Sequence, residues 1–505
     1  MGESVTIILI GSNNFDPALV TKVWSLNPIE VIVILSNSEN KELISYLKSK
    51  ECKVIVKEET GQNEGYIAAL NEAIGDIFLF INSNDSTIQT EQIELFLEPI
   101  ISSRADVVLN NISPSFLQKR VKQWPDCLTL CRQVFNDSLG FNHFLIDSLL
   151  SLPHAFTKKV KKSLGTDCFE NLVVAHLKIL ENDFNISRHI SIESQFIGNH
   201  YTPEQSHYTI PISDTEIKEL NMFLEAWIEW FRIHGERGNY HDGGRRRDIV
   251  EDIKKSNKLS DYATIHMGSG RTSSLYGGKQ LSIVIPAQNE ETTIGAVISQ
   301  ARLAEPLEII VVVNGSNDKT EEIAKQYGTT VLVFEEALGI DVGRAIGALF
   351  AKGDILLFID ADFPIHFRDL QQFGLSVANG ADIALNDLNI DYFPLYVVNL
   401  YKYLLNMICN CKELGVGSLV AVPHAISRSC LNGIGWDSLI NPNLAHVKGI
   451  LQGYKLENVH FVDVMKPNRI RPDQHFSKLG HPKAVLRIIG DHLEAIAYLC
   501  DKGVN

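Results

Sequence analysis

Short apolar runs bounded by polar residues recur along the chain, and patterns typical of amphipathic helices lie between them. Three of these runs are Thr6–Ile10, Glu30–Leu35 and Asp76–Ile81. Unbroken apolar runs of this length are typical of interior strands in a parallel sheet whose two faces are covered by helices. Because the predicted strands alternate with predicted helices, the pattern indicates an α/β fold with a doubly wound parallel sheet.

The second half of the chain repeats the pattern of the first. The run Glu308–Val313 matches Glu30–Leu35 at an offset of 278 residues (308 − 30). Further along, Ser418–Ala425 matches Ser148–Ala155 at an offset of 270 residues (418 − 148). Because two nearly constant offsets hold over such a length, we interpret the chain as a tandem duplication of one α/β domain.

Composition marks a join between the two copies. Residues 256–279 are rich in serine and glycine, as is typical of a surface linker. We therefore predict a first domain at residues 1–250, a linker at 251–278 and a second domain at 279–505. The triplet Arg245–Arg247 stands just before the linker, and we interpret it as a solvated turn, with a phosphate or anionic-lipid contact as the alternative.

The totals exclude some classes of protein. The chain has 505 residues and a net charge of −15, which argues against a nucleic-acid backbone as its main partner. Its eight cysteines lack paired zinc-ligand spacing and do not form a disulfide framework, so we expect thiols in a reducing cytoplasm. Met1–Ile8 lacks the features of a signal peptide, and no stretch reaches the apolar length of a membrane span.

The apolar run Gly353–Ile359 ends in two carboxylates, Asp360 and Asp362. In open α/β sheets, ligands bind outside the carboxyl ends of the strands, which is where these aspartates are expected. Two carboxylates this close repel each other unless a cation shares their field. Mg²⁺ or Mn²⁺ would neutralise them while bridging to a diphosphate. Taken alone, the pair is better explained as an acidic solvated loop.

Polar residues also follow two other predicted strands. The strand Leu281–Ile285 runs into Pro286–Glu290, and Glu308–Val313 runs into Asn314–Ser316. Helix capping explains the first of these polar segments, but not why both strands end in small polar groups. Two such strand ends side by side form a slot for a nucleoside. Arg344 enters a helix from a glycine-spaced loop and could reach a diphosphate with bidentate geometry.

In order and spacing, these motifs resemble the family 2-type glycosyltransferases. They read Ile-Pro-Ala-x-Asn-Glu-Glu, Asn-Gly-Ser-x-Asp-x-Thr, Gly-x-x-x-Gly-Arg-Ala-x-Gly and Phe-Ile-Asp-Ala-Asp. The resemblance implies two tandem GT-A domains and a metal-dependent enzyme that moves a sugar from a nucleotide-diphosphate sugar, with a UDP-sugar expected, to an unknown hydroxyl acceptor. The second copy is also similar to the glucosyl-3-phosphoglycerate synthase-like enzymes. The alternative is a protein that binds nucleotide sugars or glycans without turnover.

The resemblance also implies roles for individual residues. Those implied around the nucleotide sugar are Pro286, Ala287, Glu290, Asn314, Ser316, Arg344 and Asp360. Asp360 and Asp362 would hold the metal, and His475 would complete its shell as a histidine does in the synthase-like enzymes. His424 and Arg428 offer polar groups toward the acceptor, although a shared structural role for His424 is as good a reading because His154 recurs in the first copy.

The second copy departs from the family pattern in two places. Val313–Asn314 stands where the family usually has two aspartates, which leaves the choice between UDP and another nucleotide open. Asn441–Pro442 stands where the family often has a Glu-Asp pair that contains the general base. Asp437 and Asp387 are the remaining candidates for that base, and a retaining mechanism stays open as well.

The first copy separates residues of the fold from residues of the chemistry. It keeps the strand Asp76–Ile81 but has Asn82 and Asn84 in place of the two aspartates, and Tyr66 in place of the arginine. Neutral amides bind a divalent ion less well than carboxylates do. We therefore predict that the first copy is degenerate and non-catalytic, and that it serves as a scaffold, acceptor-binding or dimerising domain. Oligomerisation and a peripheral membrane contact both stay open.

Overall fold

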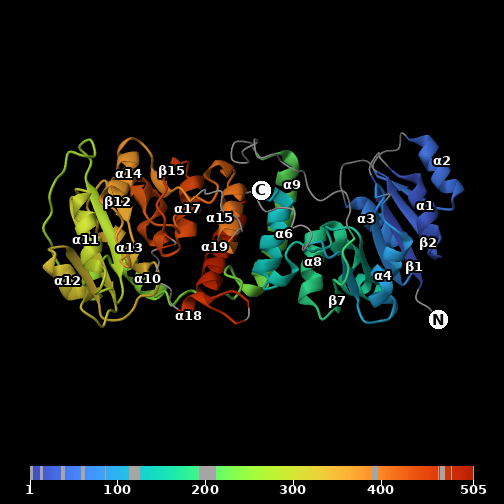
Figure 1. Ribbon diagram of the computed structural model, residues 1–505, viewed down its shortest axis with the longest axis horizontal. Coiled ribbons are helices and arrows are strands. Elements are labelled where there is room, and N and C mark those ends of the chain that lie inside the picture. Colours follow the sequence, from blue (N-terminus) through green and yellow to red (C-terminus); the bar gives the residue numbers. More distant parts are fainter. Residues whose placement is uncertain are drawn as a thin grey trace. The chain divides into compact units, whose positions relative to one another are not determined.

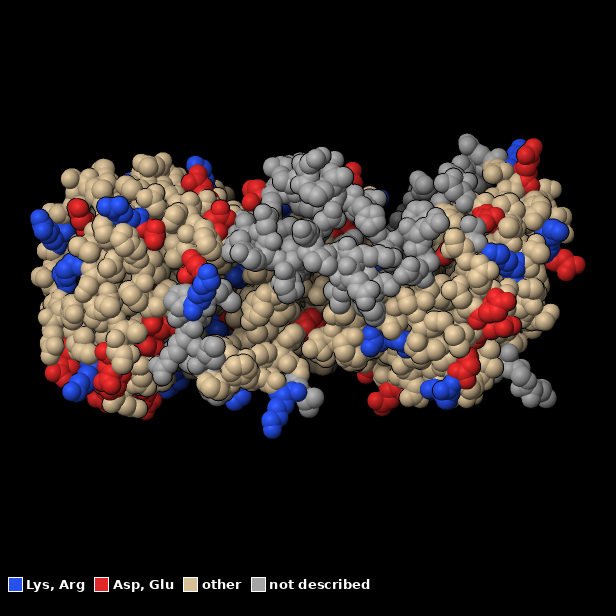
Figure 2. Space-filling model, viewed as in Figure 1, with Lys and Arg blue, Asp and Glu red and all other residues tan. Residues whose placement is uncertain are grey.

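In the computed structural model, the chain forms two compact units, each built on one sheet (Figure 1). The structure describes residues 4–11, 15–35, 40–57, 63–85, 87–112, 125–192, 212–388, 396–464, 466, 472–478 and 480–503. The first unit contains the described residues of Met1–Glu204 and Ser213–Ile233, and the second contains those of Gln205–Ile212 and His234–Asn505. On the face seen in Figure 2, acidic and basic side chains are interspersed over the described surface of each unit.

The first unit has a seven-stranded sheet with the order β3-β2-β1-β4-β6-β5-β7. Its strands are β1 (Val5–Gly11), β2 (Glu30–Leu35), β3 (Lys53–Val56), β4 (Ile77–Asn82), β5 (Val107–Leu109), β6 (His154–Thr157) and β7 (Ile186–Ser187). The apolar runs of the sequence thus form β1, β2 and β4, which lie side by side and parallel. β6 runs antiparallel to β4 and β5, so the sheet is mixed where we predicted a parallel one.

Helices cover both faces of this sheet. The described helices of the unit are α1 (Pro17–Trp24), α2 (Lys41–Ser49), α3 (Glu64–Glu72), α4 (Thr90–Ile101), α6 (Cys127–Ser138), α7 (Lys158–Leu164), α8 (Leu172–Glu181) and α9 (Asp214–His234). Successive strand residues face opposite sides of the sheet. Ile7 therefore packs in one core with Leu19 of α1, while Ile8 packs in the other with Leu70 of α3. The predicted doubly wound α/β architecture is confirmed.

The second unit has an eight-stranded sheet with the order β15-β13-β14-β12-β9-β10-β11-β8. Its strands are β8 (Thr264–His266), β9 (Leu281–Ala287), β10 (Glu308–Asn314), β11 (Thr330–Phe334), β12 (Ile355–Phe358), β13 (Ile383–Asn386), β14 (His424–Ser427) and β15 (Leu456–His460). β14 runs antiparallel to β12 and β13, as β6 does in the first unit. The repeated topology confirms the predicted duplication.

The second sheet also carries helices on both faces. They are α10 (Arg247–Ser256), α11 (Ile294–Leu303), α12 (Thr320–Gln326), α13 (Val342–Phe350), α14 (Phe367–Ala378), α15 (Val397–Ile408), α16 (Arg428–Ile434), α17 (Pro442–Leu451), α18 (Pro472–His475) and α19 (Lys483–Asp501). Residues of α11 and α14 belong to one core, and residues of α13 and α16 belong to the other. Among the described helices, none combines the length and the apolar composition that crossing a membrane requires.

Buried polar contacts recur in the two units and therefore belong to the fold. Thr6 Oγ1 donates a hydrogen bond to Glu30 Oε1 at 2.7 Å, and Ser282 Oγ donates to Glu308 Oε1 at 2.8 Å. Paired asparagine and histidine side chains recur in the same way, as Asn136 with His176 and Asn406 with His446. Because a buried polar group must be satisfied, these matched pairs need no role in chemistry.

The segment that we predicted as a linker contributes structure to the second unit. Most of α10 lies within residues 251–278, and β8 pairs antiparallel with β11 at the edge of the sheet. The change of unit falls between residues 233 and 234, before the predicted linker. The interpretation of Arg245–Arg247 as a solvated turn was wrong, because the side chain of Arg245 is 0% exposed and pairs with three carboxylates.

Candidate functional site

Several predicted site residues of the second unit lie where three parallel strands end. β9 pairs with β10 on one side and with β12 on the other. The carboxyl ends of parallel strands meet at one edge of a sheet, and ligands of open α/β sheets bind there. Asp360 and Asp362 follow shortly after β12, and Asp362 lines a cleft together with the loops after β9 and β10.

The loops after β9 and β10 are tied to each other by hydrogen bonds. The backbone N–H of Asn289 donates to Ser316 Oγ at 3.0 Å, and the N–H of Asn317 donates to Asn289 Oδ1 at 2.8 Å. The N–H of Glu291 donates to Asp318 Oδ2 at 3.0 Å. Both loops therefore form one wall with a fixed shape, and the hydroxyl of Ser316 helps to hold the two loops together.

A cleft of about 270 Å³ opens between these loops and the end of β12. Its lining residues are Asn289, Glu290, Glu291, Thr292, Thr293, Asp318 and Asp362. Burial alone would raise the pKa of Asp318, but hydrogen bonds from Thr320 and from the N–H of Glu291 outweigh it and lower that pKa. Carboxylate oxygens are the ligands that hard divalent cations prefer, so this lining suits such a cation.

Arg344, in the first turn of α13, lies beside the first aspartate of the pair. Its Nη2 is 2.9 Å from Asp360 Oδ1, and its Nη1 is 3.1 Å from Asp341 Oδ1. The side chain is 9% exposed. Burial alone would lower the pKa of the guanidinium, but Asp360 and Asp341 outweigh it and raise that pKa. The structure thus brings together Arg344 and Asp360, two predicted site residues that come from different predicted elements.

Asn314, which the resemblance put beside the base, is engaged by the loop before α13. Its Nδ2 donates to the carbonyl of Gly339 at 3.0 Å, and its Oδ1 accepts from the N–H of Leu338 at 2.5 Å. Gly315 beside it has φ +65, and an added Cβ would lie 2.5 Å from the nitrogen of Ala337. The tight turn after β10 therefore requires glycine, and Asn314 fixes the loop that leads to Arg344.

Pro286 and Ala287 are the last two residues of β9, at the end of the strand that leads to the cleft. Pro286 is half-buried and Ala287 is buried, so both contribute backbone and apolar surface at this end of the strand. An added Cβ on Gly343 would lie 2.9 Å from Pro286 Cβ. α13 therefore packs closely against β9, which brings the start of that helix to the predicted nucleoside slot.

The two predicted acceptor residues lie at opposite ends of β14. His424 faces Phe358 at the end of β12, whereas Ser427, next to Arg428, faces Ile355 at its start, because the two strands run antiparallel. Arg428 Nε and Nη2 donate to the carbonyl of Gly353 at 3.0 and 2.9 Å. Arg428 therefore braces the amino end of β12 and is not brought to the cleft.

His424 is buried, and the charge of Arg344 acts on it. It is 1% exposed, and its Nδ1 lies 2.8 Å from the carbonyl oxygen of Ala421. Burial, with the charge of Arg344, lowers its pKa to about 3, so the imidazole stays neutral. His154 makes the matching contact with the carbonyl of Ser151 at 3.1 Å in the first unit. The recurrence favours the structural reading of His424.

The other predicted residues lie outside the lining of the cleft. Asp437 precedes α17 and pairs with Lys254 Nζ of α10 at 2.7 Å. Asp387 follows β13, and its backbone N–H donates to the carbonyl of His460 at 3.0 Å. His475 ends the short helix α18 and is half-buried. None of these three residues is among the lining residues of the cleft.

Asn441, at the position where the family often has a carboxylate, is a helix cap. Its Oδ1 accepts from the N–H of Asn443 at 3.1 Å, and its Nδ2 donates to the carbonyl of Asp491 at 3.1 Å. Asn171 in the first unit caps α8 and donates to the carbonyl of Met222 at 3.0 Å. The matched contacts assign this position to the fold in both units.

The corresponding place in the first unit has different chemistry. Tyr66 stands where the second unit has Arg344, and its hydroxyl lies 2.8 Å from His154 Nε2. Its ring stacks on Phe80 with the centroids 4.1 Å apart. Asn82 and Asn84 follow β4, and the N–H of Asn84 donates to Asn82 Oδ1 at 3.0 Å. The first unit thus has neither the cation nor the two carboxylates at this strand end.

Comparison with known proteins identifies the repeated element. The model of glycosyl transferase family 2 matches residues 18–157 and 282–385. Two segments of the chain therefore match the model of glycosyl transferase family 2. One family 2 segment ends within β6 and the other within β13, so the two copies of the duplication each carry one.

Individual relatives share shorter regions with the chain. Glycosyltransferase AglE of Haloferax volcanii is 34% identical over 121 residues, which are 22% of this chain and 40% of AglE. The 4,4'-diaponeurosporenoate glycosyltransferase of Staphylococcus aureus is 37% identical over 100 residues, which are 19% of this chain and 27% of that enzyme. The chain therefore spans less than half the length of these two curated relatives.

A solved structure is also similar to part of the chain. Glucosyl-3-phosphoglycerate synthase from Mycobacterium tuberculosis, in complex with Mn²⁺, UDP and glucosyl-3-phosphoglycerate, is 24% identical with a TM-score of 0.32. The match covers 39% of this chain and 75% of that chain. The family 2 matches, and not this likeness, carry the assignment of the two segments.

Sequence reasoning missed two carboxylates near the site. Asp318 lines the cleft, and Asp341 holds Arg344. The signal for Asp318 was its place in the polar turn after β10, which we had used only for Asn314 and Ser316. The signal for Asp341 was its place three residues before Arg344 at a helix start, the spacing at which two side chains meet.

Proposed function

We propose that the second unit is a metal-dependent glycosyltransferase that moves a sugar from a nucleotide-diphosphate sugar to a hydroxyl acceptor. The observation that carries the proposal is the meeting of Arg344, Asp360 and a carboxylate-lined cleft at the carboxyl end of β12. This arrangement lies in and beside a family 2 segment. A UDP-sugar is the donor that we expect.

The donor set at the cleft fits a hard divalent ion. Its charged side chains are carboxylates, which Mg²⁺ and Mn²⁺ prefer over neutral nitrogen or sulfur ligands. Asp360 and Asp362 would hold the ion, and His475 is a further candidate ligand. When bound, the ion supplies Lewis-acid stabilisation of the charge that develops on the leaving diphosphate.

The residues of this chain would bind and orient the donor. Pro286 and Ala287 would lie against the nucleoside, where the end of β9 offers apolar surface. Arg344 would donate to diphosphate oxygens, since a guanidinium presents its N–H groups in a fork that matches such anions. The hydrogen-bonded loops of Asn289 and Ser316 support this role because they keep the wall of the cleft in one shape.

The general base is a separate part of the proposal. Asp387 and Asp437 stay candidates for an inverting reaction, although Asp437 pairs with Lys254. Asn441 caps α17, which leaves no carboxylate at the place where the family often has its base. A retaining reaction therefore stays as the alternative mechanism.

We infer that the first unit is non-catalytic and serves as a scaffold, acceptor-binding or dimerising domain. Tyr66 fills the place of Arg344, bonds to His154 and stacks on Phe80, which supports the loss of diphosphate binding there. The eight free thiols of the chain suit a reducing compartment, which supports the expected cytoplasmic location.

A protein that binds nucleotide sugars without turnover is the second candidate function. The helix-capping role of Asn441 favours it. Thermal unfolding of the full chain with a panel of nucleotide sugars, with and without Mn²⁺, is followed by an assay for released nucleotide. A Mn²⁺-dependent rise in the melting temperature with nucleotide release supports the transferase. A rise without release under any acceptor condition supports the binding protein, and no rise with any nucleotide sugar refutes both.

A further inference from the structure

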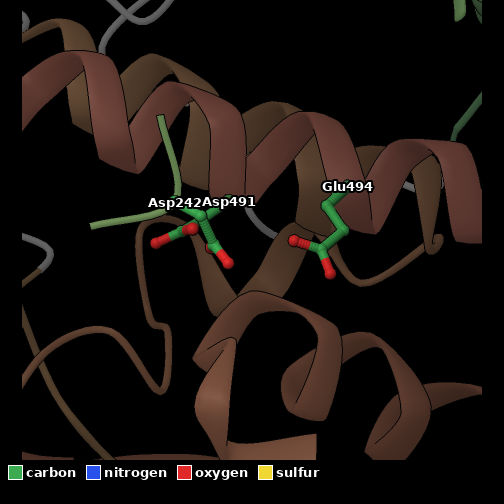
Figure 3. A group of neighbouring side chains, drawn as sticks. All are labelled: Asp242, Asp491 and Glu494. Carbon is green, nitrogen blue, oxygen red and sulfur yellow. The ribbon is translucent and has the colours of Figure 1, made fainter. Parts of the chain in front are cut away.

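Three carboxylates converge beside α19 in the second unit (Figure 3). Asp242, Asp491 and Glu494 each offer an oxygen, and these oxygens lie within 4.8 Å of one another. Arginine side chains pair with all three carboxylates. Arg245 Nη1 lies 2.7 Å from Asp242 Oδ1 and from Asp491 Oδ1, and Arg247 Nη1 lies 2.7 Å from Glu494 Oε1. The group is therefore an ion-pair network, and we assign no metal to it.

The same network reaches Arg344 and Asp360, which are predicted to bind the nucleotide sugar. Arg245 Nη1 and Nη2 bind both oxygens of Asp491, at 2.7 and 2.9 Å. Arg245 Nη2 also lies 3.0 Å from Asp341 Oδ2, and Asp341 Oδ1 lies 3.1 Å from Arg344 Nη1. Arg344 Nη2 then lies 2.9 Å from Asp360. Alternating charges thus run without a break from α19 to the end of β12.

The middle of this chain of charges is removed from water. The side chains of Arg245, Asp341 and Arg344 are 0%, 8% and 9% exposed. Burying such charges is costly unless each is paired with good geometry, and removing one partner leaves the other unpaired. The Nε of Arg344 has no hydrogen-bond partner in the part of the chain that the structure describes. The arginine nearest the cleft therefore keeps a donor that the fold does not use.

Asp341 has an unusual left-handed backbone conformation, and its side chain does not cap the helix that follows. It stands at the N-cap of α13 with φ +61, in the left-handed region that non-glycine residues seldom adopt. An aspartate at this position normally accepts a hydrogen bond from the first turn of the helix. The side chain of Asp341 makes no such bond and instead pairs with Arg344, with Arg245 and, at 3.5 Å, with Arg487. Its carboxylate therefore serves the arginines.

The first unit supplies an internal comparison. The offset of 278 residues puts Asn63 and Tyr66 where the second unit has Asp341 and Arg344 (341 − 278 and 344 − 278). Asn63 stands at the N-cap of α3, as Asp341 does at that of α13. The carboxylate and the arginine are thus lost together in the unit that lacks the two aspartates, although the helix is kept.

We propose that Asp341 is a positioning residue for Arg344, and that Arg245 holds Asp341 in place. Asp341 stays paired with Nη1 of Arg344 and so holds the guanidinium in its orientation. Nη2 can then leave Asp360 and donate to a phosphate oxygen of a nucleoside diphosphate. The inference rests on the proposed function of the site. It also gives a role in that site to Arg245, which lies in the segment that precedes the second family 2 match.

A double-mutant cycle on UDP binding tests the proposal. UDP affinity is measured by calorimetry with Mn²⁺ present, on the full chain, for wild type, Asp341→Asn, Arg344→Met and the double variant. Asp341→Asn is expected to weaken UDP binding about tenfold, as the loss of one charge-assisted contact does. In the Arg344→Met background the same substitution is expected to change the affinity less than about twofold, because Asp341 acts through Arg344.

Two further variants keep the test decisive. Arg245→Met removes the closer of the two further arginines that pair with Asp341 Oδ2, at 3.0 Å, and leaves Arg487 Nη1 at 3.5 Å. It is also expected to weaken UDP binding only when Arg344 is present. Arg247→Met is the matched control, because it removes the pairs with Asp242 and Glu494 and leaves those of Asp341. It is expected to lower the melting temperature and to leave UDP affinity unchanged.

Each outcome decides between the two proposals. Equal UDP affinity in wild type and Asp341→Asn overturns the inference and leaves the proposed function standing. A tenfold loss that persists in the Arg344→Met background, or an equal loss in Arg247→Met, also overturns it, because Asp341 then acts through the general stability of the unit. A wild-type chain that binds neither UDP nor any other nucleoside diphosphate with Mn²⁺ overturns the proposed function, and the inference falls with it.

Discussion

Replacing Asp360 by asparagine separates the chemistry of the second unit from its fold. Asp360 accepts from Arg344 Nη2 at 2.9 Å, and its side chain is 38% exposed. Asparagine has nearly the same shape and keeps an oxygen for this hydrogen bond. A charged acceptor contributes about 1 kcal/mol more than a neutral one, and solvent reduces that difference. We expect Asp360→Asn to lower the free energy of unfolding by less than about 1 kcal/mol.

The effect of Asp360→Asn on the reaction is expected to be larger. A neutral amide oxygen binds a divalent cation less well than a carboxylate does. If about 3 kcal/mol of transition-state stabilisation is lost, the rate falls by more than about 100-fold. The assay is nucleotide release from a UDP-sugar with Mn²⁺, measured beside thermal unfolding of the same samples.

The matched control for this prediction lies in the first unit. Asn82 ends β4 as Asp360 follows β12, and it accepts from the N–H of Asn84. Asn82→Ala is expected to leave nucleotide release within about twofold of wild type, a change of roughly 0.4 kcal/mol in the barrier. Equal losses in both variants, or a small loss in Asp360→Asn, would refute the division into a catalytic and a degenerate unit.

Three other substitutions test the structure of the second unit. Gly315→Ala introduces a Cβ 2.5 Å from a backbone nitrogen at φ +65, so we expect a loss of stability of more than about 1 kcal/mol, measured by denaturant unfolding. Arg428→Met removes donors to the amino end of β12, and we expect a lower melting temperature with unchanged UDP affinity; weaker UDP binding would contradict its placement. Burial would raise the pKa of Asp242, but Arg247 and Arg245 outweigh it and lower that pKa to about 2. Because the folded pKa lies below the ordinary 3.8, this stabilisation is complete above that value and is lost as the pH falls toward 2. Acid unfolding of Asp242→Asn should lack this part of the pH dependence, and an unchanged acid profile would contradict it.

The parts of the fold that are local in sequence could be predicted from it. The apolar runs that became β9, β10 and β12 carry their own signal, because a strand buried on both faces needs unbroken apolar residues. The polar residues after each run could be placed at one edge of the sheet for the same reason. Asp362 and Glu290 therefore line the cleft that the pattern of strand ends indicated.

What could not be predicted depends on contacts between distant residues. Arg245 binds Asp491 and Asp341, which are 246 and 96 residues away, so nothing near the arginine triplet indicated burial. Arg428 stood four residues after His424, but the direction of β14 took the two to opposite ends of β12. Serine and glycine around β8 suggested a linker, because composition does not reveal pairing with β11.

The edge strand β8 has a consequence for dissecting the protein. A fragment that begins at residue 279, where we predicted the second domain to start, loses β8 and leaves β11 with a row of unpaired backbone groups. Such an open edge is a template for pairing with another chain and favours aggregation. The same cut removes Arg245, the buried arginine that pairs with both Asp491 and Asp341. A fragment that begins at residue 234 keeps both the edge strand and the arginines, so it is the shorter piece to express when the second unit is studied alone.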